Sequence, residues 1–183
     1  MRFIGSFELK EKSVIISDPC YPKGTWCQGR LDNVKIGTWE AVVKEDESCR
    51  IITELIAYHS DAVDDISRLD GRWEEKPFPI GVDSGQAGFF QESVYRNDNT
   101  SLDYFDYFYD EYPRLEGDRW YGVCCGITLS ENRAGVLDNG VVSSSGIGDG
   151  CYTLYTVEKD GEVIAMKLIF CYEEEIGKQV KYA

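Results

Sequence analysis

Three aspartates stand beside sharp-turn sequences in distant parts of the chain: Asp18 in SDPCY, Asp83 in GVDSGQAGFF and Asp149 in SGIGDGCY. Carboxylate oxygens are the ligands that magnesium and calcium bind in proteins, so convergence of these three side chains would create a metal site. Alternatively, each carboxylate accepts backbone N–H bonds within its own turn, as aspartate does in Asx turns. The neighbouring proline and glycines are typical turn formers and favour the second interpretation, so no metal site is predicted.

Two further polar side chains, Ser84 and Gln86, follow Asp83 in the same glycine-rich stretch. Glycine permits positive φ and close backbone approach, so we expect this stretch to meet the other two turn sequences in one junction. At that junction Ser84 and Gln86 could bind a small polar ligand or satisfy buried backbone groups. One functional hypothesis is therefore a small-ligand or metal-dependent binder or hydrolase that uses Asp83 and Asp149.

The usual catalytic nucleophiles and bases have little support in the sequence. His59 is the sole histidine, and its position at the end of an alternating run fits a surface or edge residue. Cys124 and Cys125 are adjacent, so their sulfurs would lie on opposite faces of a strand, and Cys20 and Cys27 lack CxxC spacing. The seven cysteines are expected to be free and mostly buried thiols. We predict no catalytic residue and no cofactor.

Residues 97–118 combine seven carboxylates with six tyrosines or phenylalanines. Apolar residues recur there at helical spacing from Leu102 to Tyr109, and aspartates recur one position later, which predicts a short helix with a carboxylate ridge. Such a ridge could occupy the basic groups of a partner, while tyrosines stack on its arginines. The alternative is a solvated helix face. The predicted partner-binding residues are Asp103, Tyr104, Asp106, Tyr107, Asp110, Glu111 and Tyr112.

The charge of the chain is strongly unbalanced. Its 183 residues include 33 acidic and 19 basic side chains, which give a formal net charge of −14. This charge repels phosphates and anionic lipids, so direct nucleic-acid binding and membrane association are not expected, whereas a basic protein partner is. The N-terminal sequence lacks the apolar run of a signal peptide, and no stretch approaches the roughly 20 apolar residues of a spanning helix. A cytoplasmic location is expected.

Alternation of apolar and polar residues predicts a protein built mainly of β-strands. The expected strands are residues 2–9, 13–17, 38–44, 50–59, 80–83, 120–129, 152–157 and 162–170. We expect the first two to form a hairpin and the next two to be antiparallel neighbours, with hairpin turns at Asp138-Asn139-Gly140 and Lys159-Asp160-Gly161. Because no repeat or linker interrupts the chain, one domain over residues 1–183 is predicted. Its fold class is α+β and mainly antiparallel β, a single twisted or sandwich-like sheet domain with one or two short helices.

The motifs SDPCY (17–21), VDSGQAGFF (82–90) and SSGIGDGCYTLY (144–155), with Trp120-Tyr121, resemble an uncharacterised bacterial and phage family known only as a domain of unknown function. The resemblance covers most of the chain and implies one domain, but no reaction and no catalytic residues. The small, acidic chain is also similar, more weakly and without a specific motif, to phage inhibitors of bacterial defence such as anti-CRISPR proteins.

The charge leads to our first functional hypothesis, a non-enzymatic acidic protein that inhibits a basic, nucleic-acid-handling partner. The most concrete partner is a CRISPR nuclease such as Cas9, since these enzymes hold nucleic acid in positively charged channels. An immunity protein that neutralises a basic toxin would have the same electrostatics. The ligand-binding or hydrolytic site at the glycine-aspartate junction is the alternative from a different functional class.

Overall fold

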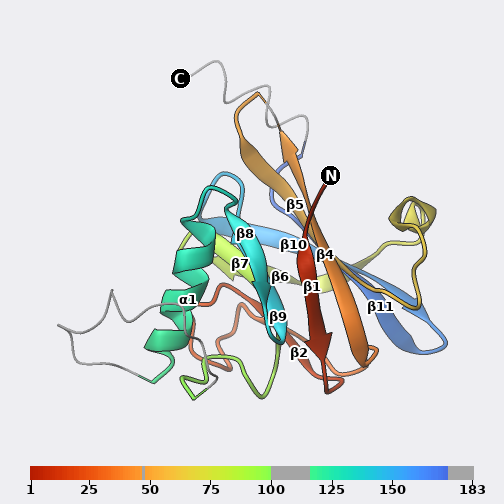
Figure 1. Ribbon diagram of the computed structural model, residues 1–183, viewed down its shortest axis with the longest axis horizontal. Coiled ribbons are helices and arrows are strands. Elements are labelled where there is room, and N and C mark those ends of the chain that lie inside the picture. Colours follow the sequence, from red (N-terminus) through yellow and green to blue (C-terminus); the bar gives the residue numbers. More distant parts are fainter. Residues whose placement is uncertain (47, 100–115, 173–183) are drawn as a thin grey trace.

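The structure, a computed structural model, describes residues 1–46, 48–99 and 116–172. These residues form two antiparallel sheets that pack against each other (Figure 1). The larger sheet has the strand order β1-β4-β5-β11-β10-β6, and the smaller sheet has the order β3-β2-β7-β9-β8. The strands are β1 (Arg2–Leu9), β2 (Val14–Ser17), β3 (Gly29–Leu31), β4 (Gly37–Asp46), β5 (Ile51–His59), β6 (Glu74–Val82), β7 (Gln86–Gln91), β8 (Ala134–Leu137), β9 (Gly140–Ser144), β10 (Gly150–Lys159) and β11 (Glu162–Ile169).

The main hydrophobic core lies between the two sheets because alternate residues of each strand face inward. On β4, Trp39, Ala41 and Val43 belong to this core, whereas Glu40 and Lys44 lie on the outer face. The smaller sheet contributes Ile16 of β2 and Phe89 of β7 to the same core. The expectation of a mainly antiparallel β protein is confirmed, but two packed sheets replace the single sheet.

Each sheet also has a second cluster of buried residues on its outer face. Helix α1 (Asp118–Thr128) places Trp120 and Val123 against Phe90 on the smaller sheet. On the larger sheet, the segment between β5 and β6 contains a short 3₁₀ helix, η1 (Ile66–Leu69), and packs Leu69 on Ile164. In the described part of the chain these are the two helical elements, and no helix is long and apolar enough to span a membrane.

The predicted hairpins near the C-terminus and the pairing of β4 with β5 are confirmed. Strands β10 and β11 are joined at Asp160 and Gly161, whose φ angles of 53° and 80° suit a tight turn. Strands β8 and β9 pair across Asp138 and Asn139. The register of β4 and β5 opposes Val42 to Ile56. Turn chemistry was therefore sufficient to locate these connections.

Two other expectations about secondary structure are wrong. Residues 120–129, expected as a strand, lie almost entirely in α1, where Trp120, Val123 and Cys124 follow the helical spacing of a buried face. The expected opening hairpin does not form, because β1 pairs with β4 whereas β2 pairs with β3 and β7 in the other sheet. The short connection between β1 and β2 therefore crosses from one sheet to the other.

His59 was expected at the surface or at an edge, but it is only 2% exposed. Its Nε2 lies 2.9 Å from the Ile36 carbonyl oxygen, and its Nδ1 accepts a hydrogen bond from the Asp61 amide. The ring also packs edge-on against Trp39. Both ring nitrogens are engaged by the backbone, so the imidazole fixes the end of β5 and the start of β4.

Candidate functional site

The centre of the glycine-aspartate junction is the carboxylate of Asp18, which is completely buried. Its Oδ1 accepts hydrogen bonds from the Cys20 amide at 2.8 Å and the Ser84 hydroxyl at 2.6 Å. Its Oδ2 accepts from the amides of Asp83 at 2.9 Å and Ser84 at 2.6 Å. Each oxygen thus has two donors, so the carboxylate is saturated and joins the turn after β2 to the turn after β6.

The third turn sequence joins the junction through the backbone. The Ser145 amide donates to the Gly85 carbonyl oxygen at 2.9 Å, and Cys151 of β10 is registered opposite Gly81 of β6. Within this turn the Tyr152 hydroxyl lies 3.0 Å from the Ser145 carbonyl oxygen. The three motifs that are separated in sequence therefore meet at one end of the sandwich.

Tyr95 and Arg96, which no sequence pattern predicted, hold this junction from the side of the smaller sheet. The Tyr95 hydroxyl lies 3.0 Å from the Asp18 carbonyl oxygen and 2.8 Å from that of Tyr21. Arg96 Nη1 donates to the carbonyl oxygens of Pro19 and Cys20, at 2.9 and 3.0 Å. Burial raises the pKa of the Tyr95 hydroxyl, which therefore stays protonated. Together the two side chains satisfy the backbone of the Asp18 turn.

Thiol and hydroxyl groups from Cys20 and from helix α1 lie next to Ser84. Burial raises the pKa of the Cys20 thiol to about 12, and the negative charge of Asp18 adds to this effect. Desolvation also raises the pKa of the Tyr121 hydroxyl. Gln86 Nε2 donates to Cys125 Sγ at 3.4 Å, and Thr128 Oγ1 donates to Gln86 Oε1 at 3.3 Å. Groups that remain neutral and bonded to one another hold turns together and make poor nucleophiles.

Asp83 and Asp149 do not lie in the buried junction with Asp18. Both are exposed, and they adjoin the last registered pair of β6 and β10: Asp83 follows Val82, and Asp149 precedes Gly150. The Asp83 carboxylate contributes, after desolvation, to a raised pKa of the Tyr21 hydroxyl through a hydrogen bond. Of the candidate ligands at this junction, the structure therefore brings Asp18 and Ser84 together and leaves the other two aspartates at the rim.

The structure gives no support to a metal centre in the described ranges. No group of three or more histidine, cysteine, aspartate or glutamate side chains is placed there to hold an ion. Asp18 could not join one without losing backbone partners, because all four of its hydrogen bonds are to protein donors.

The predicted partner-binding residues Asp103, Tyr104, Asp106, Tyr107, Asp110, Glu111 and Tyr112 lie in residues 100–115, outside the described residues. The residues on either side of this range are joined by Asp98, whose Oδ2 accepts from the Gly117 amide at 2.8 Å. Its Oδ1 accepts from the Trp120 amide at 2.9 Å, which satisfies the amino end of α1. Both ends of the acidic segment are therefore fixed beside the junction.

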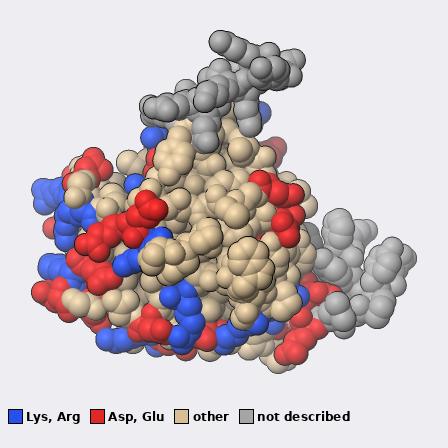
Figure 2. Space-filling view, turned by 180° about the vertical axis from the view of Figure 1, so that it is seen from behind, with Lys and Arg blue, Asp and Glu red and all other residues tan. Residues whose placement is uncertain are grey.

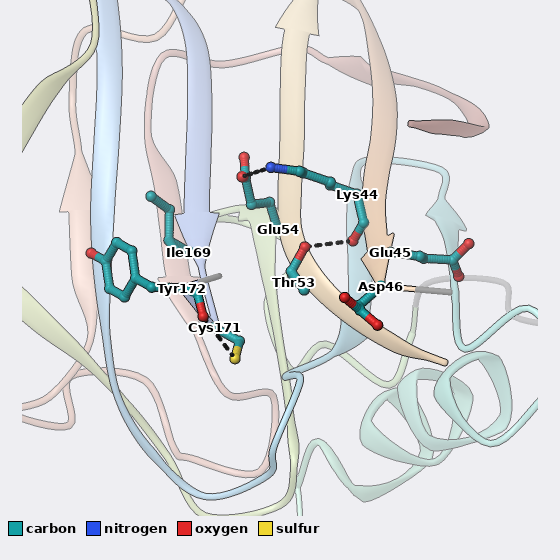
Figure 3. A pocket seen from close by; sticks show the side chains of 8 residues that line it. All are labelled: Lys44, Glu45, Asp46, Thr53, Glu54, Ile169, Cys171 and Tyr172. Atoms are coloured by element: carbon teal, nitrogen blue, oxygen red, sulfur yellow. Dashed lines mark hydrogen bonds and ion pairs between the residues drawn. The ribbon is translucent and has the colours of Figure 1, made fainter. Parts of the chain in front are cut away.

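A surface pocket of about 320 Å³ lies away from the junction, where β4 and β11 end and β5 begins (Figure 3). Lys44 Nζ lies 3.3 Å from Glu54 Oε1 within it, and Thr53 Oγ1 donates to the Lys44 carbonyl oxygen at 3.2 Å. Asp46 and Tyr172 complete its rim. None of its lining residues belongs to the junction, and its charges are mixed in sign. The pocket therefore singles out no ligand.

No family model, curated protein or solved structure matches this chain. The likeness of its turn motifs to a family of unknown function stays a prediction.

The seven cysteines are free, but fewer are buried than expected. Cys49 and Cys151 are exposed, whereas Cys27, Cys124 and Cys171 are buried. We predict that iodoacetamide at pH 8 labels Cys49 and Cys151 first, and that Cys20 reacts slowly because its raised pKa keeps it protonated. Peptide mass spectrometry of the native protein would measure this order, with urea-unfolded protein as the control. Rapid labelling of Cys124 would contradict the packing of α1.

Proposed function

We propose that this protein is a non-enzymatic acidic binding protein that inhibits a basic, nucleic-acid-handling protein, most concretely a Cas nuclease. The observation that carries the proposal is the net charge of −14 on a chain of 183 residues. Such a charge steers a protein toward positively charged surfaces and repels nucleic acid itself. Inhibition follows when carboxylates occupy the arginines and lysines that would otherwise hold phosphates.

The distribution of charge on the described residues supports the proposal, because many basic side chains are already neutralised by neighbouring carboxylates. Examples are Arg2 with Glu45 at 2.7 Å and Lys12 with Glu162 at 2.8 Å. Further ion pairs involve Lys23, Arg30, Lys35, Lys44, Lys76, Arg96 and Arg133. Paired cations attract acidic partners weakly, so the excess of carboxylates determines how the surface interacts.

The stretch from the end of β5 to the first residues of β6 carries part of this excess, and it also contains Arg68 and Arg72. It exposes Asp61, Asp64, Asp65, Asp70, Glu74 and Glu75, and in the described part of the chain none of them forms an ion pair. The segment is also firmly attached, since Val63 and Leu69 are buried against the larger sheet. Lys167 Nζ lies 4.5 Å from the ring centre of Trp73 at its end. Its carboxylates are therefore presented on an ordered surface.

The saturated Asp18 limits the alternative of a ligand-dependent enzyme to the rim residues Asp83 and Asp149. A catalytic or metal-binding Asp18 would need a free lone pair, yet its two oxygens already accept four hydrogen bonds. The ridge at Asp103, Asp106, Asp110 and Glu111 remains a prediction from the sequence. It would add further carboxylates to the same binding function.

A retention assay tests the proposal. The protein is immobilised and offered apo-Cas9, a basic ribonuclease and a neutral control protein, at about 50 mM and about 300 mM NaCl. We expect Cas9 to be retained at low salt and released at high salt, because screening weakens exposed charge pairs. Retention of the ribonuclease alone would favour an immunity protein. No retention of either basic protein at low salt would refute the proposal.

A melting scan in the same buffers tests the alternative. Magnesium, calcium or a nucleotide that binds the native state would raise the melting temperature. We expect no such rise. If the melting temperature rose in the wild type but not in Asp149→Asn, the ligand would bind at the rim of the junction, and the alternative function would be favoured.

A further inference from the structure

Trp26 is 85% exposed, which is unusual for the largest apolar side chain. Its turn is nevertheless tightly bonded. The amides of Gly24 and Thr25 donate to Gln28 Oε1 at 2.8 and 3.0 Å, and the Thr25 hydroxyl donates to the Pro22 carbonyl oxygen at 2.7 Å. The indole therefore projects from an ordered turn, and its exposure does not arise from a loose loop.

The turn is fixed to the rim of the junction through the residue after Trp26. Cys27 is buried, and its carbonyl oxygen accepts from the Gly81 amide of β6 at 3.0 Å. A Cβ atom on Gly81 would lie 2.8 Å from Cys27 Cβ, so only glycine permits this close packing. Gly81 is registered opposite Cys151, and the exposed residues Asp83 and Asp149 adjoin the next registered pair, Val82 and Gly150. Trp26 thus shares one end of the larger sheet with two exposed carboxylates.

One face of the molecule has a distinctive distribution of charge. Figure 2 shows a broad uncharged area in the middle of the face, with acidic and basic side chains gathered around its edges. Pro77 and Pro79 of β6 and Cys151 of β10 are exposed uncharged residues of these strands. The prolines leave the edge strand without two backbone donors, so side chains rather than an added strand would make contacts here.

We propose that Trp26, at the same end of β6 and β10 as Asp83 and Asp149, is the anchor of the surface that docks on the basic protein partner; this inference rests on the proposed function. An exposed indole is the type of residue that becomes a binding hot spot when a partner pocket desolvates it. The two carboxylates at the rim would meet lysines or arginines around that pocket. The partner therefore has an apolar pocket with a basic rim.

The charges also argue against other occupants of this surface. A second copy of the chain would bring Asp83 and Asp149 toward their own counterparts and oppose two molecules of net charge −14. A nucleic acid could stack a base on the indole, but its phosphates would face the same two carboxylates, and Lys23, the cation of the Trp26 turn, is paired with Glu92 at 2.8 Å. A basic protein can provide an apolar pocket for the indole and cations for the two carboxylates.

The first test compares two exposed apolar residues. Trp26→Ala should weaken binding to apo-Cas9 by about tenfold or more, whereas Leu129→Ala, at 81% exposure on the end of α1, should change it less than about twofold. Biolayer interferometry measures both affinities. Because neither side chain is buried, both variants should melt like the wild type. Equal affinities of the two variants would overturn the proposal.

The second test observes the indole directly. The chain has four tryptophans, and Trp39 and Trp120 are buried. In protein labelled with 5-fluorotryptophan, the Trp26 resonance, assigned through Trp26→Phe, should shift or broaden on addition of unlabelled apo-Cas9. The resonances of Trp39 and Trp120 should stay in place. An unchanged Trp26 resonance in a formed complex would exclude the indole from the interface.

The third test concerns the carboxylates. The double variant Asp83→Asn with Asp149→Asn should reduce the dependence of affinity on salt, because two charges leave the contact. Asp138→Asn, an exposed aspartate in the β8–β9 turn, is the matched control. A control that reduces the salt dependence equally would mean that net charge, rather than this surface, determines binding.

The outcomes separate this inference from the proposed function. If the wild type binds no basic protein, the proposed function fails and the docking surface fails with it. If the wild type binds and Trp26→Ala binds equally well, the docking surface alone is wrong. If the wild type sediments as a dimer that Trp26→Ala dissociates, the indole serves a second copy of the chain and the proposed partner is wrong.

Discussion

Asp18→Ala should lower the free energy of unfolding by about 3–5 kcal/mol, because it removes a buried carboxylate that accepts four hydrogen bonds. The substitution would leave the amides of Cys20, Asp83 and Ser84 without an acceptor in a site that excludes water. Urea denaturation followed by tryptophan fluorescence would measure the change. The hydrogen bonds that join the turn after β2 to the turn after β6 would be lost at the same time.

The neighbouring aspartate is the matched control for this prediction. Asp83→Ala removes an exposed carboxylate one residue before Ser84, so its cost should stay within about 1 kcal/mol. Asp18→Asn should fall between the two, because its amide nitrogen cannot accept the hydrogen bonds of one pair of donors. If Asp18→Ala and Asp83→Ala are equally stable, Asp18 is not the centre of the junction.

Gly88→Ala should cost about 3 kcal/mol, since the added methyl group has no space in β7. A Cβ atom there would overlap the Val141 carbonyl oxygen and lie 2.5 Å from Phe90 Cζ, so β7 and β9 would have to separate. The expected result is a lower melting temperature and faster hydrogen exchange of the β9 amides.

Gly85→Ala is the control for the glycine prediction. Gly85 has a φ of 69°, but a Cβ atom there would have no neighbour within 4 Å. The cost should therefore be limited to backbone strain, about 1 kcal/mol. A larger loss for Gly85→Ala than for Gly88→Ala would show that turn strain, rather than packing between the strands, limits stability.

The sequence was a sufficient guide to the strands and their tight turns, because alternation and Asn-Gly or Asp-Gly signals are local properties. The helix α1 was missed for a physical reason. Residues 120–128 of this helix, WYGVCCGIT, are apolar at most positions, and a short run of this kind does not distinguish a helix from a buried strand. The separation of β1 and β2 into different sheets was also beyond local patterns, since it depends on long-range pairing with β4 and β7.

The roles of the three aspartates could have been inferred from strand alternation. Ile80 and Val82 face the core, which places Asp83 on the outer face, and Tyr152 and Leu154 do the same for Asp149. Asp18 continues the inward series of Val14 and Ile16, so its carboxylate had to be buried and bonded. The position of each aspartate relative to the inward-facing residues of the adjoining strand was therefore the pattern that indicated its burial or exposure.

The contributions of Tyr95, Arg96 and Asp98 had no such signal. They lie in the segment after β7 and act on carbonyl or amide groups of distant turns, such as Cys20 and Gly117. A hydrogen bond to a backbone group leaves no pattern in the partner's sequence, so these residues emerge only from the fold. The exposure of Trp26 belongs to the same class, because sequence alone favours burial of an indole.

The most direct test of the account is displacement of DNA from a Cas nuclease. A fluorescently labelled target duplex is bound to catalytically inactive Cas9 with its guide RNA, and its anisotropy is followed as the acidic protein is added at low salt. If the protein occupies the basic groups that hold phosphates, the duplex should be released, and increasing salt should weaken the release. Binding of the protein to Cas9 with the duplex still fully retained would contradict the account.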